Sequence, residues 1–172
     1  KKNRTMKKKK KIKSKKKIDF LIYYRSHPNK FKNITLNFIR NLSEKFNVYI
    51  VGDYFKNKNV KNLGLISKNK IYRYLAMSKM TVSSDENLFS NFNLDCIESN
   101  IKILIGSQYL VSKTVPKKYF FKITKKEMNY KKKNLKKLIK KIENKKFKIK
   151  NKENFQPNLL KNQIDNYFSC FL

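Results

Sequence analysis

Cysteine, glycine, proline, tryptophan and histidine are all scarce in this sequence, and these scarcities exclude several classes of protein. Its 172 residues include two cysteines, three glycines, three prolines, one histidine and no tryptophan. Two cysteines cannot form a disulfide framework, which indicates a reducing compartment. With a single histidine, His27, and two cysteines, the sequence does not predict a metal site made of histidine and cysteine ligands. No apolar run approaches the roughly 18–20 residues of a membrane-spanning helix.

Several motifs of catalysis and nucleotide binding are also missing. The sequence contains no P-loop glycine-lysine signature, no G-x-G-x-x-G fingerprint, no Asp-x-Asp pair and no G-x-S-x-G nucleophile motif. We therefore expect any chemistry to proceed without a metal ion and without a covalent nucleophile.

Acidic residues are few, and the positive charge is unevenly distributed. The chain has 44 basic and 11 acidic residues, for a net charge of +33. Residues 1–17 hold 12 basic and no acidic residues, and residues 117–152 hold 17 lysines against two glutamates. We interpret residues 1–17 as a disordered basic tail or linker and residues 18–172 as one domain. With 40 lysines against four arginines, AT-rich codon usage is an alternative cause of the charge.

Short apolar runs alternate with amphipathic segments along the rest of the chain. The sequence predicts strands at 18–24, 48–51, 60–63, 80–82, 101–105 and 119–123, and helices from 33, at 68–78, 88–98, 131–146 and 158–171. Asn33 is the predicted N-cap of the first of these helices. This alternation predicts an α/β fold with a mostly parallel sheet and helices on both faces.

The ends of the predicted strands carry the candidate site residues. Arg25 leaves the first strand and Lys30 precedes the next helix, so two cations and free helix N–H groups would suit a diphosphate. Ser83–Asn87 follows a later strand, and its Glu86, together with Asp95 in the next helix, could accept hydrogen bonds from sugar hydroxyls. The alternatives are a solvated arginine and lysine, and acidic residues that only complement a helix dipole.

The order and spacing of these segments resemble a known family. The matching segments are Arg25 with Lys30, VYIVG at 48–52, NVKNLGLI at 59–66, LAMSKMTVSS at 75–84 and DENLFSNFNLD at 85–95. Residues 18–106 are similar to the C-terminal, donor-binding half of GT-B-fold glycosyltransferases of group 1. Asn29-Lys30-Phe31 stands where that family usually has Glu-Lys-Gly, and Asn100 stands where it commonly has glycine.

The resemblance implies a Rossmann-like three-layer domain and transfer of a sugar from a nucleotide-diphosphate donor to an acceptor hydroxyl. It assigns Arg25 and Lys30 to the charge of the leaving diphosphate, Gly64 to Ser67 to the nucleotide base, and Glu86, Asn87 and Asp95 to ribose or sugar hydroxyls. It implies no metal and no cofactor beyond the donor substrate. The family's acceptor-binding half is not visible, so we interpret the chain as a donor-binding half, a fragment or a truncated product.

The resemblance also implies partners and a place in the cell. The acceptor would be a glycan or a lipid-linked saccharide, and the enzyme would be cytoplasmic, with its lysines near the anionic inner face of the membrane. The alternative function is that of a basic nucleic-acid-associated protein of ribosomal type from an AT-rich genome. Its support is the two lysine-rich segments with Tyr119 and Tyr130 among them.

Overall fold

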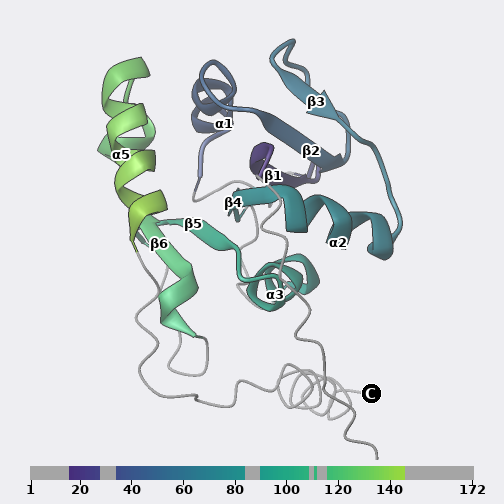
Figure 1. The fold of residues 1–172 in the computed structure, drawn as a ribbon. Helices are drawn as coiled ribbons and strands as arrows, with labels where there is room; N and C mark the ends of the chain where they lie inside the picture. Colours follow the sequence, from purple (N-terminus) through teal and green to yellow (C-terminus); the bar gives the residue numbers. More distant parts are fainter. Residues whose placement is uncertain (1–15, 28–33, 84–89, 109–110, 112–115, 146–172) are drawn as a thin grey trace, which may run out of the picture.

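Apolar runs flanked by polar turns become the strands of one sheet (Figure 1). The structure is a computed structural model that describes residues 16–27, 34–83, 90–108, 111 and 116–145. Its elements are β1 (Ile18–Tyr24), α1 (Leu36–Ser43), β2 (Val48–Gly52), β3 (Val60–Asn62), α2 (Lys68–Met77), β4 (Ser78–Val82), α3 (Asn91–Glu98), β5 (Lys102–Gly106), the 3-10 helix η1 (Lys117–Tyr119), β6 (Phe120–Ile123), α4 (Lys125–Met128) and α5 (Lys132–Asn144).

The six strands form one parallel sheet in the order β3-β2-β1-β4-β5-β6. The chain first builds outward from β1 through β2 to β3, then returns to place β4 on the other side of β1. The strand order therefore reverses between β1 and β4, which is the point where open α/β sheets bind ligands. The predicted α/β, Rossmann-like fold is confirmed.

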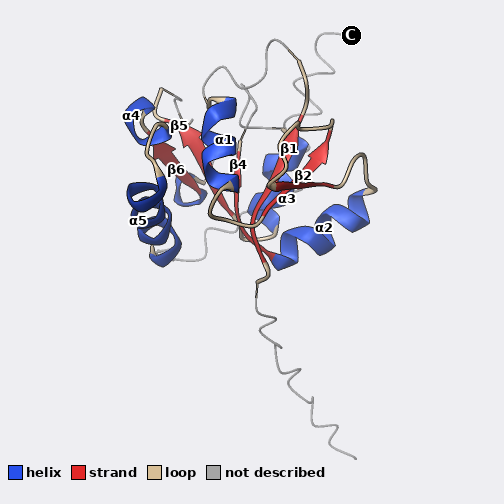
Figure 2. Ribbon diagram, turned by 90° about the horizontal axis from the view of Figure 1, so that it is seen from above, coloured by secondary structure: helices blue, strands red, loops and turns tan. Residues whose placement is uncertain are grey.

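Helices cover both faces of the sheet, so its strands are apolar on both sides (Figures 1 and 2). Phe20 and Ile22 of β1 pack with α1, α4 and α5 in one buried cluster. Leu21, between them, packs in the other cluster, with α2 and α3. Because successive strand side chains point to opposite faces, a strand buried on both faces reads as a continuous apolar run.

Helix boundaries differ from the predictions more than strand boundaries do. Helix α1 is capped by Thr35, whose Oγ1 accepts a hydrogen bond from the Phe38 amide at 3.3 Å, so the prediction of an N-cap at Asn33 is wrong. Helix α3 begins at Asn91 rather than Leu88 and is capped by Ser90. Helix α4 was not predicted, and the predicted helix at 158–171 lies outside the described residues.

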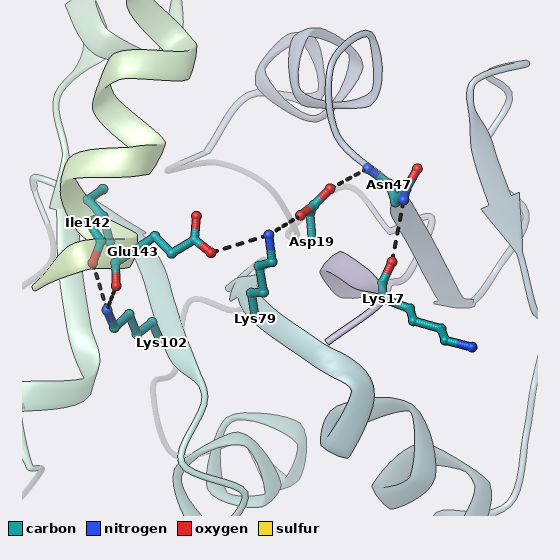
Figure 3. A network of polar contacts seen from close by, with 7 residues as sticks. All are labelled: Lys17, Asp19, Asn47, Lys79, Lys102, Ile142 and Glu143. Carbon is teal, nitrogen blue, oxygen red and sulfur yellow. Dashed lines mark hydrogen bonds and ion pairs between the residues drawn. The ribbon is translucent and has the colours of Figure 1, made fainter. Parts of the chain in front are cut away.

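An ion-pair network joins the amino ends of β1 and β4 to helix α5 (Figure 3). Lys79 Nζ lies 2.8 Å from Asp19 Oδ1 and 3.2 Å from Glu143 Oε1. Asp19 Oδ2 also accepts a hydrogen bond from the Asn47 amide at 2.9 Å. The hydrogen bond with Asp19 raises the pKa of Lys79 against the opposing effect of burial. The network thus connects α5, which lies far away in the sequence, to the amino ends of the neighbouring strands β1 and β4.

Beside this network, buried Lys102 on β5 caps the carboxyl end of α5 (Figure 3). Its Nζ donates to the backbone oxygens of Ile142, Glu143 and Lys145 at 2.7, 2.5 and 2.8 Å. The last carbonyls of a helix have no partners within the helix, and the helix dipole makes this end negative. Burial lowers the pKa of Lys102. The lysine thereby fixes α5 against the sheet.

Replacing this lysine tests the cap. We expect Lys102→Met to lower the free energy of unfolding by about 2–3 kcal/mol, because it removes a charged donor from several carbonyls. The matched control is Lys122→Met on the neighbouring strand, an exposed position where the change should stay within about 0.5 kcal/mol. Urea unfolding followed by circular dichroism measures both, and equal values for the two variants would contradict the capping role.

Candidate functional site

The carboxyl ends of the parallel strands bring several polar residues to one edge of the sheet. Arg25 follows β1, Asp53 follows β2, and Ser83 follows β4. Gly64 lies two residues after β3. These neighbouring strands flank the position between β1 and β4 where the strand order reverses. The edge formed by their carboxyl ends is therefore the candidate site.

Arg25 is held by contacts to β1 and to the end of β2. Its Nη1 donates to the Tyr23 hydroxyl at 3.3 Å, and its Nε lies 3.7 Å from Asp53 Oδ2. The same carboxylate oxygen accepts a hydrogen bond from the Ser26 amide at 2.8 Å. The hydrogen bond to Tyr23, followed by the attraction of Asp53, raises the pKa of Arg25. Since about half of the arginine side chain is exposed (49%), a ligand can reach it.

Close backbone contact between β1 and β2 requires glycine at position 52. Gly52 has φ +104°, and a Cβ atom there would lie 2.3 Å from the carbonyl oxygen of Tyr24. Its amide donates to the Gly64 oxygen at 3.0 Å, and the next amide, that of Asp53, donates to the Tyr24 oxygen at 2.9 Å. These bonds connect the ends of three strands and place Asp53 beside Arg25.

A buried pair of polar side chains lies at the carboxyl end of β4. Asn93, in the first turn of α3, donates from Nδ2 to Ser83 Oγ at 3.0 Å, and both residues are buried. The other amide atom, Asn93 Oδ1, is buried without a hydrogen-bond partner among the described residues. Exchanging the two ends of the amide would only turn the unpaired acceptor into an unpaired donor. A buried unpaired polar atom beside the order reversal is a candidate ligand contact.

Asp95 lies on α3, and its side chain contacts α2. Its Oδ1 lies 2.8 Å from the Tyr72 hydroxyl and 3.4 Å from Lys68 Nζ. The same hydroxyl lies 2.8 Å from Glu98 Oε2, so one proton is shared between two carboxylates. Burial, followed by the hydrogen bonds to Asp95 and Glu98, strongly raises the pKa of Tyr72. The carboxylate of Asp95 thus joins two helices.

Some of the predicted site residues lie at the carboxyl edge, others lie on or next to α2 and α3, and the rest fall outside the described residues. Arg25 and Gly64 are connected through Gly52 and Asp53 at the carboxyl edge. Ser67 is the exposed N-cap of α2, and the next residue, Lys68, contacts Asp95. The contacts of Asp95 are thus made with α2, whereas those of Arg25 are made at the ends of β1 and β2. The predicted residues Lys30, Glu86 and Asn87 lie outside the described residues.

We predicted no role for Asp53, Tyr72 or Asn93 from the sequence. Asp53 follows a glycine that ends a predicted strand, and this position in the sequence could have placed it at the carboxyl edge. Tyr72 and Asn93 lie on helices, and the partners of their side chains come from other elements. No local pattern in the sequence indicates such pairs.

Comparison with known proteins adds no family to this description: no protein-family model matches the chain, and no curated protein matches it either. The described residues contain no group of three or more His, Cys, Asp or Glu side chains that could hold a metal ion. Within the same residues, no helix has both the length and the apolar character needed to cross a bilayer.

The glycine that joins β1 and β2 can be tested with a matched pair of substitutions. We expect Gly52→Ala to lower the free energy of unfolding by about 3 kcal/mol or more, because an unfavourable φ is combined with a backbone clash. Gly64 also has a positive φ, +68°, which lies in the left-handed region, but no described atom lies within 4 Å of a Cβ added there, so Gly64→Ala should cost about 1–2 kcal/mol. Chemical unfolding measures both, and equal losses would show that the close approach is unimportant.

The Tyr72 hydroxyl should make stability depend on pH in the alkaline range. Because its folded-state pKa lies above the ordinary value of 10.0, the folded protein retains this proton after the unfolded chain has lost it. The stabilising contribution is complete below pH 10 and is lost as the pH rises from 10 toward the folded-state pKa. We therefore expect the difference in unfolding free energy between the wild type and Tyr72→Phe to shrink above pH 10.

The matched control for Tyr72→Phe is Tyr54→Phe, since Tyr54 is 75% exposed. The unfolding free energy of Tyr54→Phe should stay close to that of the wild type at every pH. Unfolding curves measured at a series of pH values test this, and a Tyr72→Phe difference that stays constant from pH 8 to 11 would contradict the shared-proton contact.

Proposed function

We propose that the carboxyl edge of this sheet binds a nucleotide-diphosphate sugar and that the chain is the donor-binding half of a glycosyltransferase. The observation that carries the proposal is the position of Arg25, which directly follows β1 at the order reversal of an all-parallel sheet. This is the place where the strand ends of such folds leave room for a ligand. The arginine supplies the positive charge that a diphosphate requires.

Arg25 would act on the leaving group. When the bond between the sugar and the diphosphate breaks, negative charge grows on the departing phosphate oxygen while the acceptor hydroxyl bonds to the sugar carbon and releases its proton. A guanidinium held in place beforehand stabilises that charge without having to reorient. The contacts with Tyr23 and Asp53 supply this positioning. The remaining N–H groups of the guanidinium are available to phosphate oxygens.

A hydroxyl-rich ligand also suits the buried pair at the end of β4. Asn93 Oδ1 lacks a partner among the described residues, but it is fully buried, so a hydroxyl or a base N–H would reach it only if the residues around it moved. Asp95, by contrast, already contacts Tyr72 and Lys68, which favours a positioning role between helices. The proposal therefore rests on Arg25 rather than on Asp95.

The backbone at Asn100 supports the resemblance on which the reaction type depends. Asn100 precedes β5 at the position where the family commonly has glycine, and its φ is +57°. This left-handed conformation favours glycine, and asparagine is among the few other residues that adopt it readily. The substitution therefore preserves the turn into β5.

Ligand-induced stabilisation tests the proposal. We expect a nucleoside diphosphate or its sugar conjugate, at about 100 times its dissociation constant, to stabilise the full chain by about 2.7 kcal/mol. For a chain of this size, each kcal/mol corresponds to a rise in melting temperature of about 2–4 °C. Arg25→Ala should weaken binding about ten- to a hundredfold, since it removes a charge-assisted contact of about 1.5–3 kcal/mol.

The matched control is Arg73→Ala, which removes the same charge from an exposed position on α2. It should leave the ligand-induced shift unchanged. Isothermal titration calorimetry gives the affinities. The proposal fails if millimolar nucleoside diphosphate leaves the melting temperature unchanged, or if both arginine variants weaken binding equally, because the contact would then be one of net charge.

A further inference from the structure

A concave surface, half of whose lining residues are lysines, runs along the β6 edge of the sheet. This groove, of about 630 Å³, lies between β6 with its preceding 3-10 helix and the carboxyl half of α5. Its basic residues are Lys117, Lys118, Lys122, Lys141 and Lys145. Strands β4 and β5 separate β6 from β1, so the groove is distinct from the edge that carries Arg25. Figure 1 shows α5 and β6 together on one side of the molecule.

The acidic residues near this groove are already engaged. Glu127, the acidic residue among the lining residues, accepts hydrogen bonds from the Thr124 amide and hydroxyl at 2.8 and 2.9 Å, in the capping box of α4. Glu143 pairs with Lys79 on the other side of the α5 terminus. Glu127 keeps its negative charge in its hydrogen bonds, but it stands alone against five lysines in the lining, so the groove has a net positive charge and an anionic partner suits it.

Aromatic and aliphatic side chains line the same groove between the lysines. Phe121 and Leu138 are partly exposed there, whereas Phe120 and Ile142 are buried, and Lys102 and Lys145 lie 5.6 and 5.8 Å from the centre of the Phe121 ring. Positive charge that follows a groove, combined with aromatic surface, is the pattern of single-stranded nucleic-acid sites, where phosphates meet the cations and bases meet the rings. A hollow surface also fits a strand better than it fits the plane of a membrane.

We propose that this groove binds single-stranded nucleic acid without sequence preference. The cations that line it are all lysines, which contact phosphates as point charges and lack the planar fork with which arginine reads base edges. Binding would thus depend on the phosphate backbone and on stacking, and it would weaken steeply with salt. The proposal is independent of the nucleotide-sugar site, because it uses other residues on another edge of the sheet.

Two variants of equal charge test the groove in the full chain. The groove variant is Lys118→Gln, Lys122→Gln and Lys141→Gln. The control variant is Lys56→Gln, Lys58→Gln and Lys70→Gln, which changes exposed lysines in the loop before β3 and on α2. Fluorescence anisotropy with an oligothymidylate at a series of salt concentrations measures affinity and salt dependence for both. Comparing these variants cancels the contribution of the basic residues 1–17.

We expect the groove variant to bind the oligonucleotide at least about tenfold more weakly than the control variant. The slope of log affinity against log salt should become about 2 units less steep in the groove variant, at about 0.7 for each lost phosphate contact. The wild type should also prefer the oligothymidylate over an abasic oligonucleotide of the same length by about fivefold or more, because only the former has bases to stack. Arg25→Ala should leave this binding unchanged.

Three results would overturn the proposal. Equal weakening of both lysine variants would assign the binding to the net charge of the chain. Equal affinity for the oligothymidylate and the abasic oligonucleotide would remove the role of the aromatic surface. Groove-dependent binding of phosphatidylserine vesicles or of polyglutamate, with oligonucleotide binding unaffected by the groove variant, would identify a different anionic partner. Failure of the nucleotide-sugar proposal would appear separately, in the thermal shift with nucleoside diphosphate.

Discussion

The central strand β1 imposes the constraint on which the rest of the structure depends. It is paired along both edges, with β2 and β4, and covered on both faces, so its interior must be apolar in every direction. Polar residues are therefore confined to its ends and flanks. Asp19, near its amino end, meets Lys79, and Arg25, just beyond its carboxyl end, meets Asp53. One strand thus sets both the structural network and the candidate ligand site.

The few acidic residues of the described part hold the fold together locally. Asp19 and Glu143 meet at Lys79, Asp53 fixes the turn after β1, and Glu127 completes a capping box. Exposed ion pairs contribute little free energy individually, so their main effect here is to orient neighbouring elements. Among the described residues, the lysines other than Lys102 are exposed or half-buried, so the charge of this part of the chain lies mainly on its surface.

The sequence predicted the strands well and the side-chain partners poorly. The first strand, 18–24, was predicted with its observed bounds because a run buried on both faces has few polar residues except at its ends. The cap of α1 was misplaced by two residues because Asn33 and Thr35 are both good caps. The contacts of Asp95 and Lys102 involve residues 23 and 40 positions away, and periodicity carries no information about such pairs.

The two proposed anion sites differ in the chemistry that would give them selectivity. At the carboxyl edge a single guanidinium is oriented by a hydroxyl and a carboxylate, so recognition there depends on the geometry of a few donors. Along β6 the ammonium groups stand on flexible stems beside aromatic rings, so recognition depends on the number of charges and on stacking. Codon usage that enriches lysine would increase charge everywhere on the surface. It would not hollow a groove lined by rings, nor hold an arginine at the point where the strand order reverses, and these two features therefore carry the functional argument.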